Sequence, residues 1–431
     1  MMSPDEAREV VSRALSFVHA DHAEAVLAGG IEQSTRFANS AITQNIVKQQ
    51  SSLSVRVAFG NRVGVASTTR YAEDDLRRTV ERAEELARLA EPDTEYLPPP
   101  GPAQYPQTSC FVAQTVEATP EQRAEAIRAA ISACESQGLR ASGSFTTDGG
   151  FMAVANTNGL AAYTSESFAR FIITAIGEDS SGWAESCSRD VREISAEAAA
   201  RKASEKALAA AHPRDVEPGA YPVILEPAAA GEMLSYMVYS LDAKAAHEGR
   251  SAFSGKEGQR IADDAVTVVS SPSDERCPAP PMFSDGMPVP DVTWISKGVL
   301  TNLACSRFWA QKTGRVFTGW PRNLILDGGR ASLDDLIAGM ERGILVTRFW
   351  YIRTVDPMKL LLTGMTRDGL FWVENGKVRH GLKNLRFNES PINMLAQVEG
   401  MATPSLTGEG MFALISPLLV KGFRFSSGTV F

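Results

Sequence analysis

The sequence predicts an α+β protein of two domains. Residues 1–217 combine amphipathic helical segments with strand-like segments, and residues 218–431 consist mainly of strand-like segments with a few separate helices. The regular alternation of strands and helices that builds a doubly wound parallel sheet is not seen. We therefore expect an N-terminal domain of mixed α/β layers over 1–217 and a C-terminal β-rich domain, barrel-like or sandwich-like with few helices, over 218–431.

Helices of the first domain are predicted from their start signals. Ser3-Pro4-Asp5-Glu6 supplies a capping serine, a proline suited to the first turn and a glutamate that can return the hydrogen bond, and Thr119-Pro120-Glu121-Gln122 repeats the pattern. Apolar residues follow both signals at helical spacing. An amphipathic segment from Asp74 and an alanine-rich segment at 196–211 predict two more helices.

Strands of the first domain are predicted from alternation and from turns. Apolar and polar residues alternate from Leu53 to Phe59, which is typical of a half-buried strand, and Gly60-Asn61-Arg62 leads into a second strand at 63–69. Asn156 to Gly159 predicts a hairpin turn, because Asn and Gly tolerate positive φ. Further strands are predicted at 140–147, 151–156, 160–164 and 168–175.

The second domain begins after a proline and glycine boundary. His212-Pro213 ends the alanine-rich helix, and Glu217-Pro218-Gly219 precedes a strand at 221–225. Lys297-Gly298 and Asn375-Gly376 predict the turns of two hairpins. The remaining elements expected are hairpin strands within 292–300 and 370–378, a helix over 332–343 capped by Ser332, and a strand-like tail from Ile415 through Phe431.

Composition excludes several classes of function. The net charge of −8 argues against nucleic acid as a partner, since binding to phosphates needs clustered Lys and Arg. No apolar run approaches the roughly 20 residues that span a membrane, and the acidic, amphipathic N-terminus is unlike a secretory signal. Five widely spaced cysteines without a CxxC pair suit a reducing compartment. We expect a cytoplasmic protein with neither nucleic acid nor membrane as partner.

Three enzyme motifs begin within Gly231–Gln259, and none is complete. His247-Glu248 could open a zinc-binding helix, but no second His follows at the HExxH or HExxxH spacing. Gly249 and Gly255 enclose five residues rather than the four of a phosphate-binding GxxxxGK[ST] loop. The GxSxG turn lacks its second glycine, where Phe253 stands. We interpret the lone His-Glu pair as a solvated helix end.

Some aromatic and basic residues admit two interpretations. Four tryptophans could line a peptide groove, although aromatic residues on strands belong to the core more often. They are Trp309, Trp320, Trp350 and Trp372. Arg348 and Arg353 flank an apolar strand and could meet a peptide carboxylate, or be solvated, or form a structural ion pair.

The order of several segments resembles the TldD/PmbA (TldD/TldE) family of peptidase subunits. No single motif decides the resemblance, which covers most of the chain through the order of its segments. These are Gly249–Gln259, Ser284–Pro288, Trp294–Leu300, Val346–Ile352 and Leu361–Gly364, with weaker similarity at Ser54–Val57 and Gly64–Ser67.

The resemblance implies that the metal site of the family is degenerate in this chain. Members that cleave peptides carry HExxxH on a helix before the Gly-Arg-Ser segment and a Cys near the C-terminus. The corresponding positions are about Ser235, Tyr236 and Ser240, and the late region at 408–414 contains no Cys. Hydroxyl groups do not replace imidazole and thiolate as zinc ligands. The resemblance thus implies a metal-free chain, with no cofactor of its own.

The function implied is that of a non-catalytic, TldE-like subunit of a heterodimeric zinc metallopeptidase. A TldD-like partner would hold the zinc, and the pair would act on unfolded or leader peptides. A peptide channel in this chain could include His247, Glu248, Arg250, Arg348 and Trp350. One alternative is a stand-alone peptide-binding or scaffolding homodimer. Another is an enzyme of altered chemistry that uses His247, Glu248 or Cys305.

Overall fold

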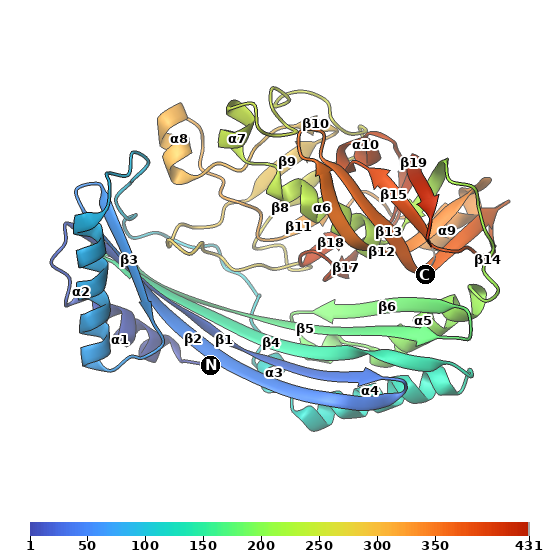
Figure 1. The fold of residues 1–431 in the computed structure, drawn as a ribbon, viewed down its shortest axis with the longest axis horizontal. Helices are drawn as coiled ribbons and strands as arrows, with labels where there is room; N and C mark the ends of the chain where they lie inside the picture. Colours follow the sequence, from blue (N-terminus) through green and yellow to red (C-terminus); the bar gives the residue numbers. More distant parts are fainter. Residues whose placement is uncertain (430–431) are drawn as a thin grey trace.

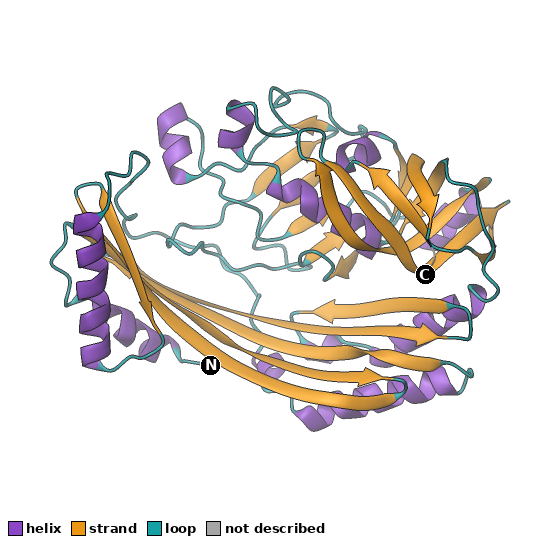
Figure 2. Ribbon diagram, in the orientation of Figure 1, coloured by secondary structure: helices purple, strands orange, loops and turns teal. Residues whose placement is uncertain are grey.

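The computed structural model describes residues 1–429 and shows two halves facing each other (Figure 1). A long, curved antiparallel sheet formed within residues 22–188 carries helices on one face. A β-rich unit formed within residues 220–428 lies over the other face, which we call the inner face. Strands dominate both halves (Figure 2), so the α+β class is confirmed.

The N-terminal sheet has the strand order β3-β2-β1-β4-β5-β6. Every neighbouring pair is antiparallel, and the turn between β4 and β5 has Gly159 at a φ of 85°, as the Asn-Gly signal predicts. The strands are β1 His22–Ala38, β2 Ala41–Phe59, β3 Arg62–Thr68, β4 Arg140–Asn156, β5 Ala161–Ile176 and β6 Ser181–Ser188.

Helices cover the opposite, outer face at both ends of this sheet (Figure 1). Ser3 with Glu6 and Thr119 with Gln122 form the two predicted capping boxes. A Cβ atom at Gly64 would collide with the backbone of α2, so β3 approaches that helix closely because it has glycine there. The elements are α1 Pro4–Leu15, α2 Glu73–Leu89, α3 Ala113–Val116, α4 Pro120–Glu135, a 3-10 turn at Val191–Glu193, and α5 Ala196–Ala209.

Five strands of the second half close into a barrel, so the barrel-like alternative is confirmed over the sandwich. The order is β12-β7-β19-β15-β13, and β13 pairs back with β12. Phe349, Phe387 and Phe423 pack together in the core, with ring centroids 4.5–5.5 Å apart. The barrel strands are β7 Ala220–Leu225, β12 Arg342–Asp356, β13 Leu361–Glu374, β15 Leu385–Glu389 and β19 Leu418–Gly428, and they are extended by β14 Lys377–Gly381 and β16 Val398–Met401.

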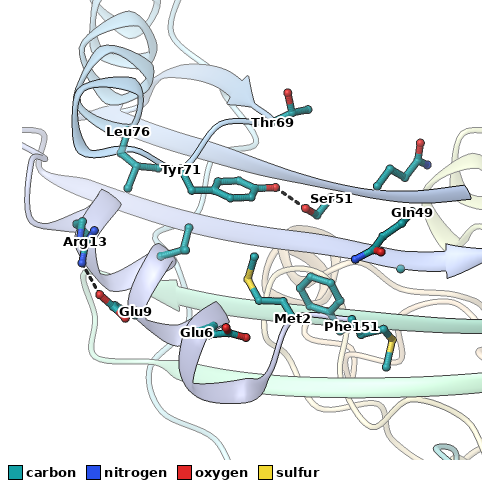
Figure 3. Close-up of a pocket in the computed structure, with 14 residues that line it drawn as sticks. Met2, Glu6, Glu9, Arg13, Gln49, Ser51, Thr69, Tyr71, Leu76 and Phe151 are labelled. Atoms are coloured by element: carbon teal, nitrogen blue, oxygen red, sulfur yellow. Dashed lines mark hydrogen bonds and ion pairs between the residues drawn. The ribbon is translucent and has the colours of Figure 1, made fainter. Parts of the chain in front are cut away.

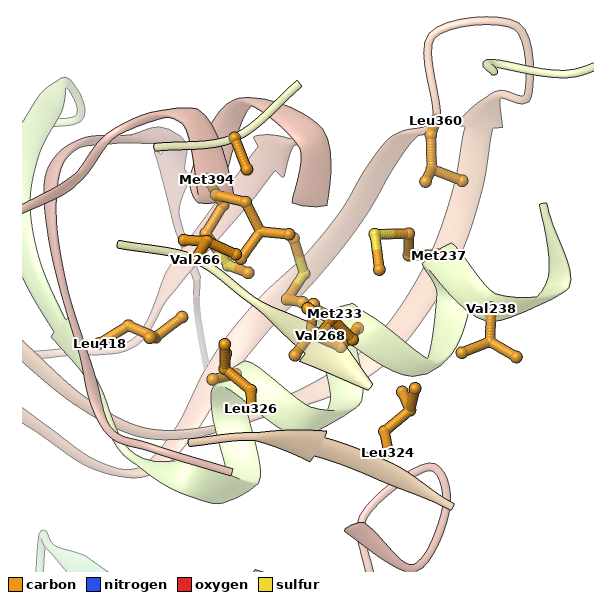
Figure 4. Close-up of a cluster of buried hydrophobic side chains, with 14 of the residues drawn as sticks. Met233, Met237, Val238, Val266, Val268, Leu324, Leu326, Leu360, Met394 and Leu418 are labelled. Atoms are coloured by element: carbon orange, nitrogen blue, oxygen red, sulfur yellow. The ribbon is translucent and has the colours of Figure 1, made fainter. Parts of the chain in front are cut away.

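A second sheet packs beside the barrel, in the order β10-β9-β8-β11-β18-β17. Helix α6, Pro227–Tyr239, lies within the shared core, where Met233 and Met237 meet side chains of both parts (Figure 4). The other elements are β8 Val268–Ser270, β9 Val292–Ser296, β10 Val299–Leu300, β11 Leu324–Leu326, β17 Ser405–Thr407, β18 Ala413–Ile415, α7 Ala243–His247, α8 Arg307–Thr313, α9 Leu333–Gly339 and α10 Pro391–Ala396.

Several boundaries differ from the sequence prediction. β1 and β6 were not predicted, and β2 begins at Ala41 rather than at Leu53. Each of β4 and β5 is one long strand where two short ones were expected. The helix expected over 332–343 ends at Gly339, and residues 430–431 of the expected terminal strand lie outside the described residues. No helix within residues 1–429 is long and apolar enough to cross a membrane.

Candidate functional site

Helix α6 carries the positions at which the resemblance places the metal motif. Glu226 precedes Pro227 at the first helical position, and an alanine-rich turn follows, so the local sequence favours a helix start here. The helix is largely enclosed between the barrel and the second sheet. Its buried residues are Ala228, Ala229, Ala230, Gly231, Met233, Leu234, Ser235, Met237 and Val238.

The hydroxyl positions of this helix are engaged in hydrogen bonds within the protein. Ser235 Oγ donates to the Glu232 carbonyl oxygen at 2.7 Å, and Tyr236 Oη donates to the Ile352 carbonyl oxygen at 2.7 Å. Ser240 caps the C-terminal end of the helix, and its carbonyl oxygen accepts a hydrogen bond from Ser251 Oγ at 2.7 Å. All three positions thus have structural contacts.

The loop in which the resemblance expects a late Cys lies directly against α6. Gly410 has a φ of 77°, and a Cβ atom placed on it would come within 2.5 Å of Ser235 Oγ. The fold therefore places the late loop next to Ser235, and the residues that meet there are a glycine and a serine. Among residues 1–429, no group of three His, Cys, Asp or Glu side chains could hold a metal ion. The residues at this site do not fit zinc.

Glu232 lies one turn before Ser235 and carries a poorly satisfied carboxylate. Its Oε2 atom is buried and has no hydrogen-bond partner. Burial, with a smaller contribution from Glu409, raises the pKa of Glu232 to about 7, against the opposing effect of Arg348 and Arg170. Helix α6 therefore carries a carboxyl group whose pKa lies near neutral pH.

Charged residues around Glu232 lie where the N-terminal sheet meets the second half. Arg348 Nη2 lies 2.9 Å from Asp368 Oδ2, and Arg170 bridges Glu185 at 2.9 Å and Glu409 at 2.5 Å. Only 15% of the Arg348 side chain is exposed. Arg348 therefore takes part in a structural ion pair at the junction of the two halves.

The other candidate channel residues lie in two different places. His247 and Glu248 are exposed at the end of α7, where Glu248 pairs with Arg250. The ring centroids of His247 and Trp309 lie 5.2 Å apart in an edge-on arrangement. Trp350 belongs to the barrel and is 44% exposed. The five candidates thus form two groups, with His247, Glu248 and Arg250 at the end of α7 and Arg348 and Trp350 on β12.

The candidate tryptophans and Cys305 differ in how far they are exposed. The Arg367 guanidinium lies 4.0 Å from the Trp350 ring centroid. Trp309 and Trp372 belong to the core, whereas Trp320 is 38% exposed. Cys305 is buried, and burial raises the pKa of its thiol. The protonated thiol is thus favoured at neutral pH, and a thiol is a weak nucleophile.

Sequence reasoning missed two cavities on opposite faces of the N-terminal sheet. The outer cavity measures about 930 Å³ and lies between α1, α2 and β2 (Figure 3). The inner cavity measures about 680 Å³. Gln50, Ser51 and Thr69 line both. The Gly29-Gly30 and Gly149-Gly150 pairs, which lie on paired strands and also line the inner cavity, were the available signal.

Three family models match nearly the whole chain. They are the PmbA/TldA metallopeptidase domain 1 over residues 23–87, the central domain over 114–211 and the C-terminal domain over 218–427. The first two models fall within the N-terminal half, and the third covers the C-terminal half.

Two curated relatives are similar in sequence. The metalloprotease PmbA of Escherichia coli O157:H7 is 24% identical over 404 residues, which cover 88% of this chain and 87% of that protein. A metalloprotease of Methanothermobacter thermautotrophicus is 23% identical over 228 residues, and the match spans about half of each chain, 49%.

Solved structures share the fold. TldE from Thermococcus kodakarensis matches with a TM-score of 0.87 at 17% identity, covering 98% of this chain and 100% of that chain. A protein of Bacteroides thetaiotaomicron, provisionally named a modulator of DNA gyrase, matches with a TM-score of 0.84 at 21% identity and covers both chains completely, 100%. Taken with the three family models, these matches show that the chain belongs to the PmbA/TldD metallopeptidase family.

Proposed function

We propose that this chain is the metal-free, TldE-like subunit of a heterodimeric zinc metallopeptidase that acts on unfolded or leader peptides. One observation carries the proposal. Ser235 and Tyr236, at which the resemblance puts the metal motif, donate hydrogen bonds to backbone carbonyl oxygens, and Gly410 of the late loop lies against Ser235, so none of the three offers a zinc ligand.

The two chains would divide the work of the enzyme. The metal-bearing partner would supply the hydrolytic chemistry, and this chain would supply walls that hold an extended peptide in place. Within this proposal the complex is cytoplasmic. The family membership and the similarity to a structure of TldE support the assignment.

Reconstitution tests the proposal. The chain alone is expected to contain no stoichiometric zinc and to cleave no unfolded peptide, and activity is expected to appear when a TldD-like chain with an intact HExxxH is added. Zinc content is measured by atomic absorption, and cleavage of an unfolded casein fragment is followed by mass spectrometry.

Matched substitutions on the two chains assign the chemistry. Replacing the motif glutamate of the partner by Gln is expected to abolish cleavage, whereas Tyr236→Phe and Ser235→Ala in this chain are expected to leave the rate within about twofold. About one zinc per isolated chain would contradict the proposal. So would loss of activity in His247→Ala when the variant remains folded.

A further inference from the structure

The edge of β2 that faces away from β1 is open over a long stretch. β2 pairs with β1 along its length, but β3 covers it only from Phe59 back to Leu53, which is opposite Thr68. Within residues 1–429, the segment Ala41–Ser52 has no strand on its outer side, and Figure 1 shows β2 running on past the end of β3. Twelve residues extend about 40 Å at about 3.4 Å per residue.

This edge lacks most of the devices that protect free edges. Residues Ala41–Gln50 are all exposed, and the segment AITQNIVKQQSS contains no Pro and a single charge, Lys48. Proteins usually block such edges with charges, proline or a covering element, because free N–H and C=O groups recruit other strands. An edge left open over this length is suited to accept a strand.

The two cavities flank the place where β3 ends and the open edge begins. A strand added in line with β3 would run beside Gln49–Ser52, next to Thr69, which lines both cavities. Successive side chains of a strand point to opposite faces of its sheet. Such a strand would place its side chains alternately in the outer and the inner cavity.

The cavities differ in chemistry. Glu32, Asp148 and Glu166 line the inner cavity with Lys48 as the opposing charge, and Asp148 Oδ1 is buried without a hydrogen-bond partner. Burial raises the pKa of Asp148 to about 6, and the nearby charge of Glu32 adds a smaller contribution. The carboxylate form still predominates above neutral pH. The outer cavity combines apolar side chains, which include Met2, Leu76 and Phe151, with the charged residues Glu6, Glu9 and Arg13, of which Arg13 pairs with Glu9 (Figure 3).

We propose that the edge Ala41–Ser52 binds an extended peptide as an added strand antiparallel to β2. Basic side chains of that peptide face the inner cavity, and apolar ones pack against Met2, Leu76 and Phe151 in the outer cavity. This inference rests on the proposed function, because it takes the bound peptide to be the substrate. It assigns the peptide-holding role to the N-terminal sheet, away from α6.

The test measures binding to the full chain without a partner subunit. The probe is a fluorescein-labelled peptide of about eight residues that alternates Lys with Val. We expect saturable binding by fluorescence anisotropy and slower hydrogen exchange of amides within 41–52 when the peptide is present. An analogue with N-methyl groups on alternate backbone amides is expected to bind at least about tenfold more weakly, since it cannot complete the hydrogen-bond ladder.

A cavity-filling variant and a matched control localise the peptide. A Cβ atom on Gly150 would meet Glu166 Cγ at an ordinary 3.6 Å, so Gly150→Val should fold and fill the inner cavity. It is expected to raise the Kd about tenfold. Ser144→Val alters the same face of β4 outside the cavity and is expected to leave the Kd unchanged.

Three outcomes would overturn the inference: equal binding of the N-methylated analogue, peptide binding without protection of 41–52, or protection of 41–52 by dimerisation in the absence of peptide. The first two are read by anisotropy and hydrogen exchange, and the third by sedimentation. Failure of cleavage with a TldD-like partner would instead count against the proposed function and leave the binding result standing.

Discussion

At Glu232 the balance of burial and charge predicts a dependence of stability on pH. The folded-state pKa of about 7 lies above the ordinary glutamate pKa of 4.5, so between these pH values the folded protein holds a proton that the unfolded chain releases. Stability from this group is therefore present at low pH and is lost as pH rises through about 7.

Glu232→Gln removes this dependence. We expect the variant to match the parent protein near pH 4 and to exceed it by about 3 kcal/mol at pH 8, as the shift in pKa implies. Urea unfolding at both pH values measures the difference. Glu205→Gln, on the exposed side of α5, is the control, and an equal gain at pH 4 and pH 8 for Glu232→Gln would contradict the explanation.

Gly410 permits a second prediction for a single residue, with a matched control. Gly410 and Gly138 have similar positive φ values of 77° and 73°, but a Cβ atom at Gly410 would collide with Ser235, whereas nothing lies within 4 Å of one at Gly138. Gly138→Ala is expected to cost about 1 kcal/mol from backbone strain, and Gly410→Ala about 1–3 kcal/mol more. Thermal unfolding of the two variants compares the costs, and equal losses would show that the contact with Ser235 is unimportant.

Two helices from different halves of the protein meet at one ion pair. Lys206 of α5 contacts Glu226, the residue before α6, at 2.6 Å, and both side chains are almost completely enclosed. Thr347 donates a further hydrogen bond to Glu226. The pair fixes the start of α6 against the helix layer of the N-terminal sheet.

Lys206→Met leaves the Glu226 charge buried with little compensation. We expect a loss of about 3–5 kcal/mol in the free energy of unfolding, because an unpaired buried charge is costly. Lys202→Met is the control, since Lys202 is half exposed and 3.5 Å from Glu226, and it should cost less than about 1 kcal/mol. The double variant Lys206→Met with Glu226→Gln is expected to recover part of the loss in urea unfolding, and no recovery would contradict the electrostatic explanation.

Elements with local signals could be predicted from the sequence. Thr119 with Gln122 set the start of α4, and Lys297-Gly298 and Asn375-Gly376 set hairpin turns in which all four residues have positive φ. β1 escaped prediction because its buried positions include the small Ala23 and Ala25, which contrast weakly with their neighbours. The first part of β2 escaped because it is exposed, so no burial pattern marks it.

The candidate site could be predicted only in part. The resemblance pointed to Ser235, Tyr236 and Ser240, and their place in a metal motif stays a prediction. Ser235 and Tyr236 lie on α6, Ser240 caps its end, and Gly410 lies against Ser235. The contacts of Glu232 with charges from β5, β12 and that loop depend on tertiary packing, which local sequence does not encode. The same limit applies to the cavities, whose walls come from four strands of the sheet and from helices.

At the scale of the whole molecule, polar contacts at several places join the two halves, and Arg170 makes one of them. It bridges Glu185 on β6 to Glu409, and Thr407 donates a hydrogen bond to Glu185 from the C-terminal half. Burial lowers the pKa of Arg170, but Glu185 and Glu409 more than offset this effect and raise it. The guanidinium therefore stays charged and couples the two halves.

Arg170→Met is expected to weaken that coupling and leave Glu185 and Glu409 close together without their shared cation. Calorimetry should then show the halves unfolding in two separated transitions, or in transitions further apart than in the parent protein. Arg201→Met, which breaks an exposed pair with Glu197, is the control and should leave the profile unchanged. A single, uniformly shifted transition for Arg170→Met would show that other contacts dominate.

The closure of the barrel by β19 sets an order of events during synthesis. The N-terminal sheet needs only residues up to Ser188. By contrast, β7 can pair with its neighbours only after β12 and β19, the last described strand, have been synthesised. Translation at about 5–20 residues per second separates these points by tens of seconds. During this interval the nascent sheet can fold on the ribosome, and α6 lacks the enclosure that completes its core. The last strand to be made therefore decides when the second half can fold.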